Sequence, residues 1–289
     1  MPHPPDIQSF FDPVTNTVSH VASDPNTGEC AIIDAVLDFD PRAGRTATRS
    51  ATAIIDYVRL HGLKPRWILE THVHADHMSG AQHLRQVLGG VVGIGEHVTD
   101  VQRMFADVFN LTAGFPADGS EFDRLFHDDE TFSIGEITAR VLHTPGHTPA
   151  CVTYLIGDAA FVGDSLFMPD YGTARTDFPG GDARTLFRSI QRILALPSST
   201  RMFVGHDYGA PGRKRFAWET TIEEQRRANV HVKLGTDEEV FVLMRASRDA
   251  TLEMPALILP SVQVNIRAGR LPPAETNGVH YLKIPVDVL

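Results

Sequence analysis

Residues 71–77 read Thr-His-Val-His-Ala-Asp-His, so three histidines and one aspartate fall within six consecutive positions. They are His72, His74, Asp76 and His77. Imidazole and carboxylate groups bind borderline and hard divalent metal ions. Buried histidines packed this closely without a metal would leave several ring nitrogens in need of partners. The run therefore predicts a metal site.

Three later segments have the same character. A Pro-Gly turn presents His147, because proline and glycine favour tight turns of fixed geometry. Asp164 leaves an apolar run directly after a glycine, which is a poor choice for packing and a good one for a ligand. His206 repeats that pattern after a second apolar run. We expect these segments to join the first one in a single site.

An alternation of strands and helices must position these segments. The sequence predicts strands at 30–34, 67–70, 91–94, 132–134, 137–142, 152–156, 160–162 and 202–204. It predicts helices at 52–61, 81–88, 100–111, 183–194, 220–229 and 237–245. This pattern favours an α/β fold in which helices cover sheets. Sites in such folds lie in loops at strand ends, where the candidate ligands fall.

Composition limits the classes of function. The 289 residues are 42% hydrophobic and 21% charged, as in a globular protein, and we expect one domain over 1–289. A net charge of −10 argues against nucleic acid as a partner. No apolar run approaches the roughly 20 residues that span a membrane, and no signal peptide is evident. Cys30 and Cys151 are the two cysteines, so we expect no disulfide framework and a cytoplasmic location.

Together the four segments resemble the metallo-β-lactamase superfamily: H-x-H-x-D-H, then histidine, aspartate and histidine in family order, between about residues 30 and 208. The resemblance implies an αββα sandwich, two mixed sheets covered by helices, with the site along the sheet edges. In the family's two-metal arrangement, one position takes His72, His74 and His147, the other takes Asp76, His77 and His206, and Asp164 lies between them.

Within the superfamily, the chain is similar to the persulfide dioxygenase branch, also called sulfur dioxygenase. The stretch Ala-Arg-Thr-Asp-Phe at 174–178 follows the ligand aspartate, and the tripeptide ending in Tyr208 matches the branch as well. The segment 230–289 resembles the C-terminal extension of longer bacterial members, and we expect it to pack on the domain. The short form has a cysteine two residues before the arginine, whereas this chain has Thr173.

The branch holds one Fe(II) per chain through two histidines and a carboxylate, here His72, His147 and Asp164. Such a facial set leaves open positions for O₂ and the substrate sulfur, and zinc has no accessible redox change. The resemblance therefore implies an oxidoreductase that converts glutathione persulfide and O₂ to sulfite and glutathione. Tyr208 would orient the substrate or oxygen, and Arg175 would anchor the site loop through a neighbouring aspartate.

Other functions remain open at this point. The remaining polar residues of the run, with His206, complete a two-metal set. A thioester hydrolase of the glyoxalase II type, with two Zn, Fe or Mn ions, therefore has every ligand it needs. Against it, the lysine- and tyrosine-bearing glutathione segment of that family is not found after Asp164. A lactamase is disfavoured by the missing signal peptide, and a metal-binding or sulfur-sensing module without turnover is a minor alternative.

Substrate and partner contacts are less specific. The basic cluster Arg213, Lys214 and Arg215 can meet glutathione carboxylates or simply begin a solvated helix. The apolar stretch 255–267 either packs over the site or forms a dimer contact. A twofold homodimer is the expected assembly.

Overall fold

The first of two large sheets is built from the N-terminal half of the chain. The structure, a computed structural model, describes residues 3–111 and 114–288. The sheet contains, in spatial order, β1 (Asp6–Asp12), β2 (Thr17–Ser23), β3 (Glu29–Ile33), β6 (Lys64–Leu69), β8 (Val91–Gly95) and β9 (Arg124–Phe126). The first three strands pair antiparallel, whereas β3, β6, β8 and β9 run parallel, so the sheet is mixed.

The second large sheet is also mixed. It contains, in order, β10 (Thr131–Ile134), β11 (Ile137–His143), β12 (Val152–Ile156), β13 (Ala159–Phe161), β14 (Arg201–Phe203) and β15 (Glu219–Thr221). Only β13 and β14 are parallel neighbours, so their carboxyl ends point to the same edge. A small third sheet joins β5 (Arg45–Ala47), β4 (Val36–Asp40) and β7 (Met78–Ser79).

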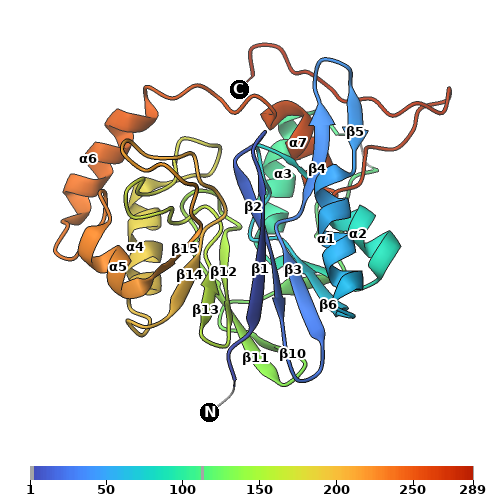
Figure 1. The fold of residues 1–289 in the computed structure, drawn as a ribbon. Coiled ribbons are helices and arrows are strands. Elements are labelled where there is room, and N and C mark those ends of the chain that lie inside the picture. Colours follow the sequence, from blue (N-terminus) through green and yellow to red (C-terminus); the bar gives the residue numbers. More distant parts are fainter. Residues whose placement is uncertain (1–2, 112–113, 289) are drawn as a thin grey trace.

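Helices cover the outer faces of both large sheets (Figure 1). The first sheet carries α1 (Arg49–Leu60), α2 (Ala81–Leu88), α3 (Val98–Val108) and α7 (Ile258–Asn265). The second carries α4 (Ala183–Leu194), α5 (Ile222–Ala228) and α6 (Glu238–Asp249). Between the sheets lies an apolar core that includes Ile33, Leu69, Val141, Tyr154 and Phe161. The layers are therefore helix, sheet, sheet, helix, and the predicted αββα class is confirmed.

Several predicted elements need correction at their ends. The predictions at 81–88, 152–156 and 183–194 coincide with α2, β12 and α4. The helix predicted at 52–61 begins at Arg49, and that predicted at 100–111 runs from Val98 to Val108. The helix predicted at 220–229 begins at Ile222, because Thr220 belongs to strand β15 and pairs with Met202 of β14. Strand pairing with a distant segment overrides local periodicity at such positions.

The turn that carries His147 is fixed by its contact with α4. Asp182 caps this helix by accepting a hydrogen bond from the backbone N–H of Thr185, at 2.7 Å. Its own backbone N–H donates to the carbonyl of Gly146, at 2.8 Å. Gly146 has a φ of 133°, and a Cβ there would lie 2.3 Å from the backbone N of Leu186. Only glycine fits this position, so the Pro-Gly turn of the sequence holds His147 against a helix end.

Candidate metal centre

Four loops that follow strands bring the predicted ligands together. His72 follows β6, His147 follows β11, Asp164 follows β13 and His206 follows β14. Ligand atoms of His72, His147 and Asp164 lie within 4.8 Å of one another. The Nε2 atoms of the two histidines are 4.0 and 3.7 Å from Oδ2 of Asp164. The three residues expected to bind iron are thus adjacent in the structure.

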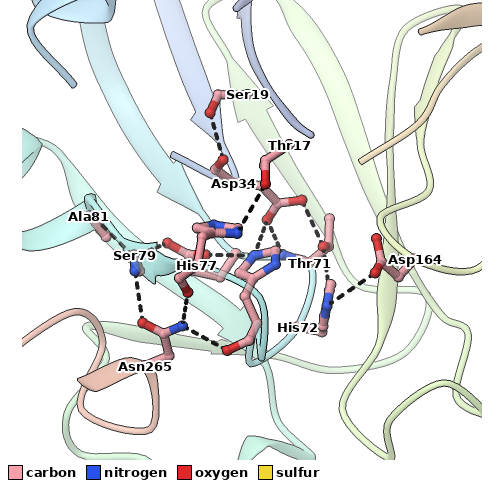
Figure 2. Close-up of polar contacts among 12 residues, drawn as sticks. Thr17, Ser19, Asp34, Thr71, His72, His77, Ser79, Ala81, Asp164 and Asn265 are labelled. Atoms are coloured by element: carbon pink, nitrogen blue, oxygen red, sulfur yellow. Dashed lines mark hydrogen bonds and ion pairs between the residues drawn. The ribbon is translucent and has the colours of Figure 1, made fainter. Parts of the chain in front are cut away.

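The tautomer of His72 follows from its neighbours (Figure 2). The single hydroxyl proton of Thr71 is donated to Oδ2 of Asp34, at 2.7 Å. The hydroxyl oxygen of Thr71 lies 3.0 Å from Nδ1 of His72, so Oγ1 accepts a hydrogen bond from that nitrogen. Nε2 of His72 then carries a lone pair, is buried, and has no hydrogen-bond partner among the described residues. A metal ion fits this orphaned nitrogen.

His147 is oriented in the same way by a backbone carbonyl. Its Nδ1 lies 2.9 Å from the carbonyl oxygen of Arg175, which can only accept, so Nδ1 carries the proton. Its Nε2 therefore faces Asp164 with a lone pair. Burial lowers the pKa of His147, and burial together with the charges of nearby histidines lowers that of His72 well below 6.5. Both rings are neutral at pH 7, as metal ligands must be.

Asp164 reaches the site because a glycine precedes it. Gly163 has a φ of 49°, and a Cβ there would lie 2.4 Å from Oγ1 of Thr71. The carboxylate of Asp164 is buried, and its Oδ1 has no hydrogen-bond partner within 3–111 and 114–288. That oxygen lies 3.3 Å from Nε2 of His206. The donor set of two imidazole nitrogens and a carboxylate fits a divalent metal ion.

His74 is held by two buried carboxylates. Its Nε2 lies 3.1 Å from both Oδ1 of Asp34 and Oε2 of Glu70. Burial lowers the pKa of His74, but the charges and hydrogen bonds of these two carboxylates outweigh it and raise that pKa well above 6.5. Nδ1 of His74 is buried and unpaired within the described part of the chain. Asp34 also accepts from the backbone N–H of Thr71, at 2.7 Å, and so ties the loop to β3.

A second group of potential ligands lies beside the first. It comprises His74, Asp76 and His206, whose ligand atoms are within 4.8 Å of one another. Oδ2 of Asp76 is 3.5 Å from Nε2 of His206 and 3.1 Å from Nδ1 of His77. Burial raises the pKa of Asp76, but the charges of His206 and His77 hold it well below its usual range. This grouping differs from the two-metal arrangement, which assigns His74 to the position of His72.

The C-terminal segment supports the histidine loop from behind (Figure 2). Nδ2 of Asn265, at the end of α7, donates to the carbonyls of His74, at 2.8 Å, and His77, at 2.7 Å. Its Oδ1 accepts from the backbone N–H of Ser79, at 2.8 Å. Part of the segment 255–267 therefore packs against the site loop, which is one of the two alternatives that the sequence left open.

Helix α6 holds the opposite wall of the site. Asp249 accepts hydrogen bonds from the backbone N–H of Thr176, at 2.9 Å, and from its hydroxyl, at 3.1 Å. Arg245 pairs with Asp249 in a buried ion pair and donates to the carbonyl of Thr173, at 3.0 Å. Arg175 lies between these anchored threonines, and its carbonyl orients His147. Helix α6 therefore holds the loop 173–176 in place, and that loop orients the predicted ligand His147.

The side chain of Arg175 contacts a neighbouring aspartate, Asp177. Its guanidinium makes two hydrogen bonds of 2.6 Å to the carboxylate of Asp177 and one of 2.7 Å to the carbonyl of Glu253. It also lies 4.8 Å from the ring centroid of Phe178. These contacts anchor the loop; a catalytic role for Arg175 stays a prediction.

A cavity of about 470 Å³ opens onto the site. Asp76, His147 and Asp164 line it, as does Tyr208. The ring of Tyr208 stacks on that of His206, with centroids 5.4 Å apart. Desolvation in the cavity and the nearby carboxylates of Asp164 and Asp76 raise the pKa of Tyr208 well above 10. Its hydroxyl is therefore protonated at pH 7 and can donate a hydrogen bond to a bound molecule.

The predicted basic cluster lies elsewhere. Arg213, Lys214 and Arg215 line a separate shallow hollow, which meets the main cavity at Tyr208. The guanidinium of Arg213 already bonds to the carboxylates of Asp170 and Asp207. A contact between this basic cluster and the substrate stays a prediction.

The two cysteines are packing residues. Cys30 and Cys151 are both buried, and burial raises the pKa of each thiol to about 12. Neither forms a disulfide.

Sequence reasoning missed several residues that support the site. Asp34 directly follows the buried strand β3, as an aspartate after an apolar run, so the signal used for Asp164 would have found it. Glu70 carries a similar signal. Asn265 and the pair of Arg245 and Asp249 carry none, because their contacts span 186 and 72 residues of chain.

Comparison with known proteins identifies the family. Residues 14–206 match the metallo-beta-lactamase superfamily. The chain is 56% identical to the beta-lactamase hydrolase-like protein of Agrobacterium fabrum over 99% of its own length, and it spans 65% of that protein. It is 49% identical to glyoxylase B2 of Dictyostelium discoideum, with 98% of this chain and 97% of the relative covered.

Persulfide dioxygenases are more distant relatives. Human mitochondrial persulfide dioxygenase ETHE1 is 29% identical, with 91% of this chain and 88% of the relative covered. The crystal structure of ETHE1 from Myxococcus xanthus superimposes with a TM-score of 0.72 at 27% identity, over 92% of this chain and all of that one.

Among the described residues, no helix is both long and apolar enough to cross a membrane. The family match covers well over half of the sequence and includes all the predicted ligands, so the chain belongs to the metallo-beta-lactamase superfamily.

Proposed function

We propose that the protein is a persulfide dioxygenase with one Fe(II) per chain. In the net reaction, glutathione persulfide, O₂ and water give glutathione and sulfite. The observation that carries the proposal is the convergence of two neutral histidines and one carboxylate, His72, His147 and Asp164, on one point. Two histidines and a carboxylate on one face are the donor set of non-haem Fe(II) oxygenases. The substrate sulfur provides the electrons that reduce O₂; Fe(II) held by these residues would supply a redox-active centre for that transfer, which zinc does not.

The residues around the ligands would serve this reaction in distinct ways. The proton on Nδ1 of each histidine is held by Thr71 or by the carbonyl of Arg175, which keeps Nε2 available. The protonated hydroxyl of Tyr208 would donate to the substrate sulfur or to oxygen at the cavity end. The buried rings of Phe167 and Phe178 line the cavity and exclude water from it.

Similarity adds support that is independent of the donor set. The relatives named persulfide dioxygenase match nearly the whole chain, and the Myxococcus structure shares its fold. The closer relatives carry hydrolase-like or glyoxylase names, so chemistry must be tested directly.

The test combines metal content with O₂ consumption. Protein purified without added metal is analysed for iron and zinc, then loaded with Fe(II) and given glutathione persulfide. We expect about one iron per chain and O₂ uptake with sulfite release. Tyr208→Phe should lower kcat about 10- to 100-fold while iron remains bound, whereas Tyr281→Phe, at an exposed tyrosine outside the cavity, should have no effect. No O₂ uptake by protein confirmed to hold iron refutes the proposal.

A thioester hydrolase of the glyoxalase II type is the second candidate. The observation in its favour is the second group of ligands, His74, Asp76 and His206, beside the first. Two metals there would activate a bridging hydroxide. Two metal ions per chain and hydrolysis of lactoylglutathione without O₂ would support this candidate over the oxygenase.

The other expectations stay predictions. They are a twofold homodimer, a cytoplasmic location, and a single domain over 1–289 with 230–289 as an extension packed on it. A metal-binding or sulfur-sensing module without turnover would be supported by tight metal binding and no reaction with either substrate.

A further inference from the structure

The cavity has an inner end at the metal ligands and an outer end at helix α6. Three arginines line it: Arg175, Arg245 and Arg248. Arg175 is neutralised by Asp177, and Arg245 by Asp249. Within 3–111 and 114–288, no carboxylate oxygen lies within 4.0 Å of the guanidinium of Arg248. Arg248 is thus the lining arginine whose charge the described part of the chain leaves unmatched.

Arg248 is exposed at the cavity wall, where an incoming molecule can reach it. Its guanidinium lies 5.8 Å from the ring centroid of Tyr171. The ring of Tyr171 lies 5.2 Å from that of Tyr208, which stacks on His206 at 5.4 Å. A row of aromatic rings therefore connects Arg248 to His206, whose Nε2 lies 3.3 Å from Oδ1 of the predicted ligand Asp164. An extended tripeptide spans about 10 Å, comparable with two of these steps.

The charges around the cavity favour a cation on the path of an anionic ligand. The chain carries a net charge of −10, and Asp76 and Asp164 line the inner end. Like charges repel an incoming carboxylate unless a positive group lies on its path. A guanidinium offers a planar pair of donors that matches a carboxylate.

We propose that Arg248 binds a carboxylate of the substrate and makes the cavity selective for anionic persulfides over uncharged ones. The inference rests on the proposed function for the identity of the sulfur group. Carboxylate recognition is a separate property, so it can be measured without turnover.

The probe is S-methylglutathione, which has both carboxylates and no reactive sulfur, beside its diethyl ester, in which both are blocked. Binding of each to the iron-loaded protein is measured by calorimetry without O₂. Arg248→Met should weaken binding of the acid about three- to fivefold, as expected for an exposed ion pair, and leave the ester unchanged. The effect should shrink at high salt, because exposed charges are screened. Arg66→Met is the matched control, since Arg66 also lies over an aromatic ring, Trp67, but lines no part of this cavity.

Each outcome decides the inference. Equal binding of the acid by wild type and Arg248→Met overturns it, as does an equal loss for the acid and the ester. Failure of the wild type to bind either probe overturns it as well. The proposed function is judged separately by O₂ uptake with glutathione persulfide. Iron-loaded protein that binds the acid through Arg248 but consumes no O₂ supports the carboxylate site and refutes the oxygenase chemistry.

Discussion

Replacing Asn265 tests whether the C-terminal segment holds the metal site together. Asn265→Ala removes both donors to the carbonyls of His74 and His77 and the acceptor for the N–H of Ser79. All three contacts are buried. Asn265→Asp keeps the acceptor for Ser79 but places a carboxylate against two carbonyl oxygens.

The magnitude follows from the number of groups left unpaired. A buried donor or acceptor without a partner costs about 1–3 kcal/mol. Three such groups give a loss of roughly 3–9 kcal/mol in the free energy of unfolding, and the lower end of that range lowers the Tm by about 6–12 °C. Asn265→Asp should lose at least as much, since like partial charges meet. Groups that orient metal ligands typically change metal affinity about 10- to 100-fold, and we expect this for both variants.

The assay is urea denaturation of metal-free and iron-loaded protein, with iron affinity measured by chelator competition. Asn277→Ala is the matched control, because Asn277 lies in the same C-terminal region but is exposed, with its Nδ2 donating to the hydroxyl of Tyr281. The control should stay within about 0.5 kcal/mol of wild type. An Asn265→Ala variant that matches the control in both stability and iron affinity would refute the reasoning.

Three further predictions concern the interior. Asp249→Leu leaves Arg245 buried without its partner and should cost about 3–5 kcal/mol by denaturation. Arg245→Met with Asp249→Leu should recover the part of that loss that comes from the uncompensated charge, while the hydrogen bonds of Asp249 to Thr176 stay lost; equal losses would contradict the ion-pair argument. In Gly163→Ala, the added Cβ would lie 2.4 Å from the hydroxyl oxygen of Thr71 and should displace that hydroxyl. We expect a lower iron affinity in chelator competition. An unchanged affinity would contradict the role given to this close contact. Burial lowers the pKa of His20 from 6.5 to about 4, so the unfolded state gains a proton first, and stability present above pH 6.5 is lost as the pH falls toward 4. Metal-free His20→Asn should lose less stability than wild type between about pH 7 and pH 4.5, and an equal loss would remove His20 as a cause.

The spacing of apolar residues along the sequence was sufficient to predict many of the helices and strands. The stretch 183–194 has apolar residues at helical spacing, and it forms α4 with that face buried. The same reasoning was wrong at Thr220, because a three-residue edge strand is specified by its partner β14 and not by its own periodicity. The N-terminal hairpin of β1 and β2 was not predicted, although the two strands pair over their full length.

The sequence by itself predicted a metal site and named side chains that the structure brings together. Histidine and aspartate at such spacing have few other uses, and strand ends bring loops together in α/β folds. It also indicated the family, through the order of His72, His147, Asp164 and His206.

Only the tertiary structure decided how those side chains are held. The proton on each ligand histidine is set by Thr71 or by the carbonyl of Arg175. The carbonyls of the histidine loop depend on Asn265, which lies 191 residues from His74. Such contacts leave no local signal, because a hydrogen bond between distant segments depends on where the chain folds back and not on the spacing of its residues. The tertiary structure also shows that Arg175 and Arg245 pair with carboxylates whereas Arg248, in the described part of the chain, does not.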